Sequence, residues 1–240
     1  RQDKYLTISI EDSNVDHAVS VLRRNDSDVS AKLKKIIKKD IKPMTSLERM
    51  HLLYDIYNMN SDYRFATGIY NGKADFSLEQ INKLGKSVKD VIGPEAFDFR
   101  PKDYFKLGDV YAQVLYLEKV PTELTTNYIS DLSDIQSNML ISMTMEKINS
   151  VKALKMVRGQ LANVEGLIAD KEHKNAENGY FGALPPELEA AQKNARELME
   201  DITGRNQNLF FMTFVVVVFA NSKKQLDDTV ALVKRTAEKH

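Results

Sequence analysis

Two stretches in the C-terminal half of the sequence carry apolar residues at alternating spacings of three and four, and they constrain the fold more than any other feature. The outgoing stretch comprises Leu154, Val157, Leu161, Val164 and Ile168, and the returning one comprises Leu184, Leu188, Ala191, Ala195, Leu198 and Ile202. A 3.5-residue period leaves a narrow apolar seam, which is buried when two helices pair. Residues 178–182 can turn the chain, and Pro185 and Pro186 suit the first turn of the returning helix. The sequence therefore predicts an antiparallel helical hairpin over residues 150–207.

Strands and helices alternate along the rest of the chain. Strands are predicted at residues 5–10, 110–118, 139–146 and 209–220, the last from a β-branched and aromatic run typical of a strand buried on both faces. Helices are predicted after Asn14, after Thr45, over 77–91, over 122–136 and after Ser222, where capping residues precede apolar residues at helical spacing. This alternation predicts an α+β fold, with a layered mixed sheet, packed helices and the long antiparallel helical hairpin.

Glycine and proline divide the chain into three predicted parts. Residues 1–58 form an N-terminal lobe of one strand and several helices. Residues 59–100 are the least regular and include Gly68, Gly72, Gly93 and Pro94, so we expect a connecting region there. Residues 101–240 form a lobe of repeated strand–helix units that contains the hairpin.

Composition excludes several classes of site. The 240 residues contain no cysteine, which rules out disulfides, zinc–thiolate sites and a thiol nucleophile. The 34 basic and 34 acidic residues balance, so no whole-protein field would gather nucleic acid. The longest apolar run, at 209–220, is shorter than the roughly 18 to 20 residues of a membrane-spanning helix. We expect a soluble protein whose anionic partners, if any, contact a local patch.

The sequence supplies no complete catalytic motif. Gly85-Lys86-Ser87 resembles the end of a phosphate-binding loop, but Gln80 stands where that motif requires glycine and the preceding residues have a helical pattern. The four histidines, His17, His51, His173 and His240, do not cluster, and His173 has a carboxylate, Glu177, four residues away. We therefore expect no catalytic residues, no bound cofactor and no metal site in these 240 residues.

The densest basic cluster is the one candidate binding site. It consists of Lys34, Lys35, Lys38, Lys39 and Lys42. Spacings of three and four put most of these lysines on one helical face. A solvated helix face is the simplest interpretation. Contact with anionic lipid headgroups or with a nucleic-acid backbone remains open, although no aromatic residues alternate with the lysines as single-strand stacking would require.

The order of three segments resembles the N-terminal region of the large ATPases of type IV secretion, the conjugal transfer family. Residues 4–10 (Lys-Tyr-Leu-Thr-Ile-Ser-Ile) precede Asn14 and a helix, and residues 103–111 (Asp-Tyr-Phe-Lys-Leu-Gly-Asp-Val-Tyr) lead into a strand that ends at Val120-Pro121. Residues 208–214 (Asn-Leu-Phe-Phe-Met-Thr-Phe) are followed by Ala220-Asn221-Ser222. The resemblance covers most of the chain, and it is loose over 58–100.

This resemblance implies a part of a bacterial ATPase that works in the cytoplasm at the inner face of the cell membrane and powers transfer of DNA and protein. The family holds ATP and magnesium in a C-terminal motor domain whose motifs do not occur here, so no catalytic or cofactor-binding residue is carried over. The implied role is docking and assembly. The implied partners are inner-membrane components of the channel and the full-length ATPase itself, with peripheral membrane contact and without direct binding of nucleic acid.

Two other classes remain open. An unrelated interaction module could use the helical hairpin to recruit a partner, with no role in transport. A free-standing nucleic-acid binder is disfavoured by the zero net charge. A phosphate-binding loop encoded after His240 would favour the ATPase, and a stop codon there would exclude it.

Overall fold

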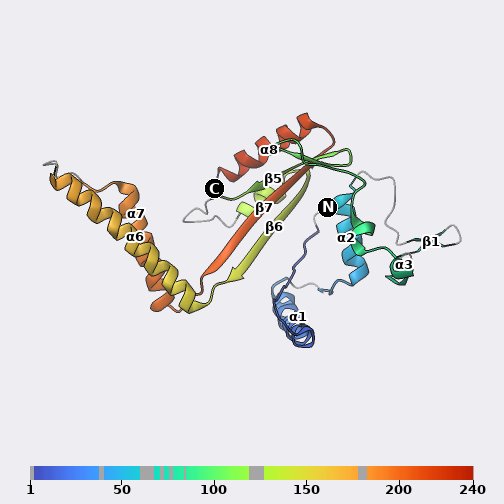
Figure 1. The fold of residues 1–240 in the computed structure, drawn as a ribbon, viewed down its shortest axis with the longest axis horizontal. Coiled ribbons are helices and arrows are strands. Elements are labelled where there is room, and N and C mark those ends of the chain that lie inside the picture. Colours follow the sequence, from blue (N-terminus) through green and yellow to red (C-terminus); the bar gives the residue numbers. More distant parts are fainter. Residues whose placement is uncertain are drawn as a thin grey trace. The chain divides into compact units, whose positions relative to one another are not determined.

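The computed structural model describes residues 3–37, 41–59, 68–70, 73–75, 78–83, 85–118, 127–177 and 183–239 (Figure 1). The helices are α1 (Val15–Ile37), α2 (Ser46–Tyr57), α3 (Leu78–Lys83), α4 (Val88–Ile92), α5 (Tyr128–Ser133), α6 (Ser150–Glu177), α7 (Pro186–Thr203) and α8 (Lys223–Ala237). The strands are β1 (Gly68–Tyr70), β2 (Lys73–Asp75), β3 (Phe97–Asp98), β4 (Phe105–Leu107), β5 (Val110–Tyr116), β6 (Asn138–Lys147) and β7 (Phe210–Ala220). Helices together with a five-stranded sheet confirm the predicted α+β class.

The main sheet has the strand order β3-β4-β5-β7-β6 and is antiparallel. The crossover β5–α5–β6 skips one position, which β7 fills from later in the chain. β5 and β6, which are joined through α5, are therefore separated by β7 and do not pair with each other. For this reason the sheet is antiparallel, although the strand–helix alternation predicts a mixed sheet. β1 and β2 form a separate antiparallel pair.

The chain divides into two compact units built from discontinuous segments. One unit contains the described residues of 1–114, 121–139 and 217–240, and the other those of 115–120 and 140–216. The division predicted from the sequence, by contrast, uses the continuous segments 1–58, 59–100 and 101–240. Strands from distant parts of the chain share one sheet, so a boundary between units passes through strands as well as loops.

The first unit has its core around the end of β7. Val218 and Leu226 are completely buried, and α8 also buries Val230 and Val233, as its predicted apolar side requires. α8 begins at Ser222, whose hydroxyl accepts a hydrogen bond from the Gln225 amide at 3.2 Å. The helix runs along the sheet (Figure 1) and packs against α5.

α2 packs between the sheet and two short helices of the same unit. Ile56 near the end of α2 and Met59 just after it contact a cluster formed by Leu107, Val110, Ala112 and Phe219. Nearer its start, Met50 is buried with Ile81 of α3. The capping box predicted at Thr45 and Glu48 is present and begins the helix. α2 therefore contributes the buried Met50 to one apolar cluster and packs the partly buried Ile56 against another.

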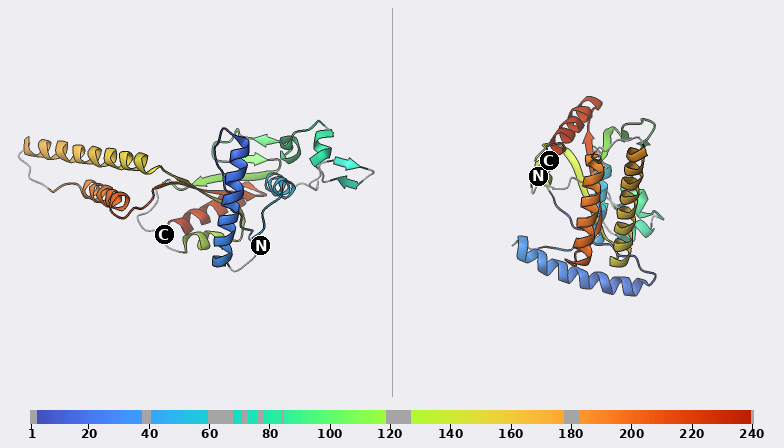
Figure 2. Two further views of the ribbon diagram at one scale, coloured as in Figure 1. Left: turned by 90° about the horizontal axis from the view of Figure 1, so that it is seen from below. Right: turned by 90° about the vertical axis from the view of Figure 1, so that its left-hand side faces the viewer.

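The second unit contains the predicted helical hairpin. α6 and α7 pack side by side (Figures 1 and 2), and every residue of the predicted seam is buried or half-buried. Val157, Ile168 and Ala195 are the most buried of these seam residues. Arg196 of α7 donates a hydrogen bond to Glu165 of α6 at 3.1 Å, which joins the two arms outside the seam. The predicted turn at 178–182 lies outside the described residues.

Several predicted elements differ from the observed ones. Residues 5–10 form no strand, and Tyr5 and Leu6 are 56% and 65% exposed. Alternating residues make a strand only where a neighbouring strand supplies hydrogen bonds, and the described residues offer these none. The described part of the helix predicted over 122–136 is shorter, from Tyr128 to Ser133. β7 is buried on both faces only toward its end, and its first residues are mostly exposed.

The hairpin of β4 and β5 was not predicted from the sequence. Leu107 and Val110 face each other across a turn of Gly108 and Asp109, in which Gly108 has a φ of 56°. A Gly-Asp pair between two apolar segments is a known two-residue hairpin signal. The signal was present, and the shortness of β4 obscured it.

Candidate functional site

The lysine-bearing helix α1 begins at a well-formed cap. The Asn14 side chain accepts a hydrogen bond from the His17 amide at 3.1 Å, as predicted for the first turn. Asp12 accepts a hydrogen bond from the Asn14 amide at 2.8 Å and pairs with the His17 ring. The Asn14 amide, and to a smaller extent the His17 ring, hold the pKa of Asp12 below its usual value. These contacts fix where α1 starts.

The apolar stripe of α1 is at most half-buried. The sequence predicts that Val15, Ala18, Val19 and Leu22 form one stripe, and Val29, Leu33 and Ile36 continue it along the same face. No residue of α1 is buried, and Val15 and Ile36 are each 76% exposed. Amphipathic helices of globular proteins normally bury such a face. The 23-residue helix therefore presents an apolar surface that the described residues leave largely open.

Asp26 interrupts this stripe. It lies four residues after Leu22 and three before Val29, which places it on the apolar face, and it pairs with the Ser30 hydroxyl at 3.4 Å. A charge on an apolar face is costly to bury in hydrocarbon unless a donor meets it. The stripe is thus better suited to a surface with hydrogen-bond donors than to the interior of a bilayer.

The five predicted lysines do not all lie on one helix. Lys34 and Lys35 occupy the last turn of α1 and are exposed, while Lys38 and Lys39 lie outside the described residues. Lys42 follows in a non-helical segment, where it bonds the Glu48 carboxylate at 3.4 Å. Lys42 therefore belongs with the start of α2 and does not extend the basic face of α1.

Glu48 serves α2 as well as Lys42. Its carboxylate accepts hydrogen bonds from the Thr45 amide at 2.8 Å and from the Thr45 hydroxyl at 2.9 Å. The Thr45 amide is the main cause, and the Thr45 hydroxyl and Lys42 smaller causes, of a Glu48 pKa below its usual value. The carboxylate thus remains ionised at the helix start, where the helix dipole also favours a negative charge.

Gly85-Lys86-Ser87 ends one helix and begins another. Gly85 has a φ of 62°, and the Lys86 amide donates to the Ile81 carbonyl at 3.1 Å, which closes α3. Ser87 then caps α4, and the Asp90 carboxylate accepts from the Ser87 amide at 2.7 Å. The Asp90 carboxylate therefore accepts the hydrogen bond of the Ser87 amide, which in a phosphate-binding loop would be available to a phosphate group. The helix predicted over 77–91 is therefore two helices, because Gly85 turns the chain between them.

The described histidines sit in separate local pairs. His51 lies 3.6 Å from Asp55, and His173 lies 3.4 Å from Glu177, each one helical turn apart. His17 is the partner of Asp12 at the start of α1. The described part of the chain contains no group of three or more side chains able to share a metal ion.

An exposed aromatic stack, which the sequence did not predict, is a second candidate surface. The rings of Phe97 and Phe99 stack with centroids 5.7 Å apart, and Phe99 stacks on Phe105 at 5.5 Å. Phe97 and Phe99 are more than half exposed. The Arg100 guanidinium binds Asp98 beside them, chiefly through side-chain hydrogen bonds, and keeps the pKa of Asp98 well below its usual value. An ion pair of Asp98 and Arg100 therefore lies beside the stack.

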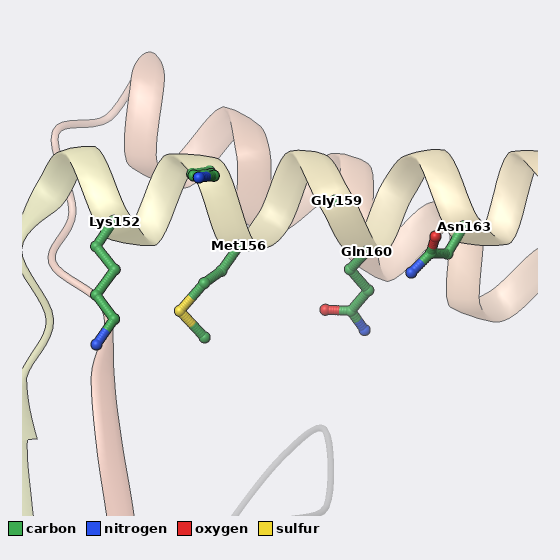
Figure 3. Close-up of a pocket in the computed structure, with 6 residues that line it drawn as sticks. Lys152, Met156, Gly159, Gln160 and Asn163 are labelled. Atoms are coloured by element: carbon green, nitrogen blue, oxygen red, sulfur yellow. The ribbon is translucent and has the colours of Figure 1, made fainter.

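A shallow depression runs along α6 (Figure 3). Lys152, Met156 and Gln160 point to the same side of the helix, and Gly159 leaves space between them. All the described residues that line it belong to one exposed helix face. Such a depression can bury only a small part of a ligand.

Comparison of the chain with protein-family models, with curated proteins and with solved structures gives no match. Among the described residues, no helix is both long enough and apolar enough to cross a bilayer.

Proposed function

We propose that this chain is a non-catalytic docking and assembly domain of a type IV secretion ATPase, placed at the cytoplasmic face of the inner membrane. The family part of the proposal rests on the resemblance of residues 4–10, 103–111 and 208–214. The docking part rests on one observation, the apolar stripe of α1, no residue of which is buried. An exposed apolar face of this length is typical of a binding surface.

The chemistry of α1 favours a protein partner with a membrane nearby. α1 carries five basic and three acidic residues, and Lys34 and Lys35 lie in its last turn. Lysines close to an anionic membrane contribute about 1 kcal/mol each, and salt screens that attraction. Asp26 within the stripe opposes deep insertion into lipid, but a protein groove can offer it a donor. Inner-membrane channel subunits would provide both kinds of contact.

Co-purification of the full chain with inner-membrane channel subunits tests the proposal. Ile36→Ser, on the stripe, should lower the recovery of the complex at least severalfold, whereas Ala31→Ser, on the opposite side of the same helix, should leave it unchanged. Because neither position is buried, both variants should melt like the parent. Equal recovery with both variants would show that the stripe of α1 is not the docking surface.

A second set of binding experiments distinguishes a protein partner from a membrane or a nucleic acid. We expect the chain to bind anionic vesicles weakly and in a salt-sensitive way, and Lys34→Gln with Lys35→Gln should reduce that binding. Micromolar binding of magnesium-ATP would contradict the non-catalytic part of the proposal. Capture of single-stranded DNA at physiological salt without capture of channel subunits would replace docking by cargo binding.

The alternative is an interaction module unrelated to secretion, and the packed hairpin of α6 and α7 favours it. Such an arm can present a partner-binding face without any transport role. If Ile36→Ser on the stripe of α1 leaves partner binding unchanged while substitutions on the exposed face of α6 abolish it, this alternative is correct.

A further inference from the structure

β6 is an edge strand of ten residues. The sheet order ends at β6, which has β7 on one side and no strand on its other side among the described residues (Figure 1). An edge strand presents a row of unpaired main-chain donors and acceptors that only another extended chain can satisfy together. Proteins usually protect long edges with proline, with a central lysine or with a bulge. From Asn138 to Thr144, β6 contains neither proline nor any charged residue.

The direction of the free main-chain groups follows from one hydrogen bond. The Ile148 amide, directly after β6, donates to the Leu209 carbonyl on the β7 side at 2.9 Å. In an antiparallel ladder the amide and carbonyl of one residue point to the same neighbour, and successive residues alternate. Even-numbered residues of β6 therefore bond toward β7. The main-chain groups of Ile141, Met143 and Met145 point to the open edge.

The side chains on this strand are also exposed. Leu140 is 38% exposed, Met143 44% and Met145 58%. Met139, Ile141, Met143 and Met145 share one face because side chains alternate along a strand. The residues whose main-chain groups point to the open edge, Ile141, Met143 and Met145, are thus all apolar.

We propose that β6 pairs edge to edge with β6 of a second copy of this chain, antiparallel and centred on Ser142. In this register Ile141 exchanges main-chain hydrogen bonds with Met143 of the partner subunit, and Met139 does so with Met145 of the partner subunit. Every hydrogen-bonded pair joins two odd-numbered residues, as the outward direction of their main-chain groups requires. The inference uses β6 alone and does not depend on the proposed function.

The register also satisfies the side chains. One face carries only apolar pairs, and the other places Ser142 opposite its own copy and Leu140 opposite Thr144 of the partner subunit. Glu146 faces Asn138 of the partner subunit, so no like charges oppose each other. A pairing that uses the same strand in both copies is isologous and has a two-fold axis. The opposite edge of the sheet is β3, of only two residues, so the assembly closes at a dimer.

Sedimentation equilibrium of the full chain tests the dimer. The mass should rise with concentration from 27.3 kDa to twice that value and not beyond. Met143→Pro removes one outward amide without touching the ladder to β7, and proline is tolerated at such edge positions. We expect Met143→Pro to abolish dimerisation and Met143→Ala, which keeps the amide, to retain it. A parent chain that stays monomeric, or a dimer that survives Met143→Pro, would overturn the proposal.

Amide hydrogen exchange of the unmodified chain gives a test that no folding defect can obscure. The amides of Ile141, Met143 and Met145 should exchange more slowly as concentration rises. The amides of Leu140 and Thr144, which bond toward β7, should be protected equally at all concentrations. If the odd-numbered amides of β6 exchange at the same rate in dilute and concentrated samples, β6 is not the interface, even where a dimer forms.

Discussion

Leu226 and Leu232 offer a matched test of where the first unit is stabilised. Both lie in α8, so replacement by alanine changes helix propensity by the same small amount at each position. Leu226 is 0% exposed and Leu232 is 40% exposed. Leu→Ala removes roughly three methylene equivalents, worth about 0.8 kcal/mol each when fully buried, or about 2.4 kcal/mol together. At Leu226 a residual cavity adds to this, and we expect a loss of about 3–4 kcal/mol.

Leu232 should respond much less. Only part of its side chain is covered, which scales the transfer contribution to about 1.4 kcal/mol or less. Solvent and neighbouring side chains can fill the space, so no closed cavity remains. Equilibrium urea denaturation followed by circular dichroism at 222 nm measures both variants, and the dependence on urea should have the parent slope. Equal losses for the two variants, or a loss below about 1 kcal/mol at Leu226, would refute the assignment of the α8 core face.

Three further predictions concern the hairpin, a turn and a helix start. Val157→Asp places an unpaired charge in the seam of α6 and should cost about 3 kcal/mol or more in denaturant titration, whereas Lys155→Asp on the exposed face should cost under about 0.5 kcal/mol. Gly108→Ala should lower stability by about 1–2 kcal/mol, because the φ of 56° strains any residue with a β-carbon although nothing lies within 4 Å of the added atom; an unchanged melting temperature would contradict this. The pKa of Glu48 is lowered in the folded protein, so the stabilisation of α2 by the Glu48 carboxylate is complete above the ordinary pKa of about 4.5 and is lost as pH falls through the folded pKa. In an acid titration followed by circular dichroism, Glu48→Gln should therefore lose helix less steeply below pH 4.5 than the parent does. Thr45→Ser keeps the cap and should behave like the parent.

Local signals in the sequence determined the helix starts and the hairpin. Thr45 and Ser222 each cap a helix because the hydroxyl and the amide that it accepts from lie within three residues, so no distant part of the chain is needed. The seam of α6 and α7 follows from periodicity for a related reason. An apolar stripe of period 3.5 is covered best by a second stripe of the same kind, and the chain supplies one directly after the turn. The apolar side of α8 was predictable on the same grounds.

The tertiary structure alone decided which apolar residues are covered and which strands are neighbours. Residues 5–10 alternate as a strand does, yet they pair with no strand in the described part of the chain, because pairing requires a partner strand that alternation cannot specify. The stripe of α1 has the same pattern as the stripe of α8, but Leu226 is completely buried and Val15 is 76% exposed. The position of β7 between β5 and β6, which leaves β6 at the edge, depends on contacts between segments about a hundred residues apart. Periodicity reports that a face is apolar, and only the fold determines whether that face meets the core or remains for a partner.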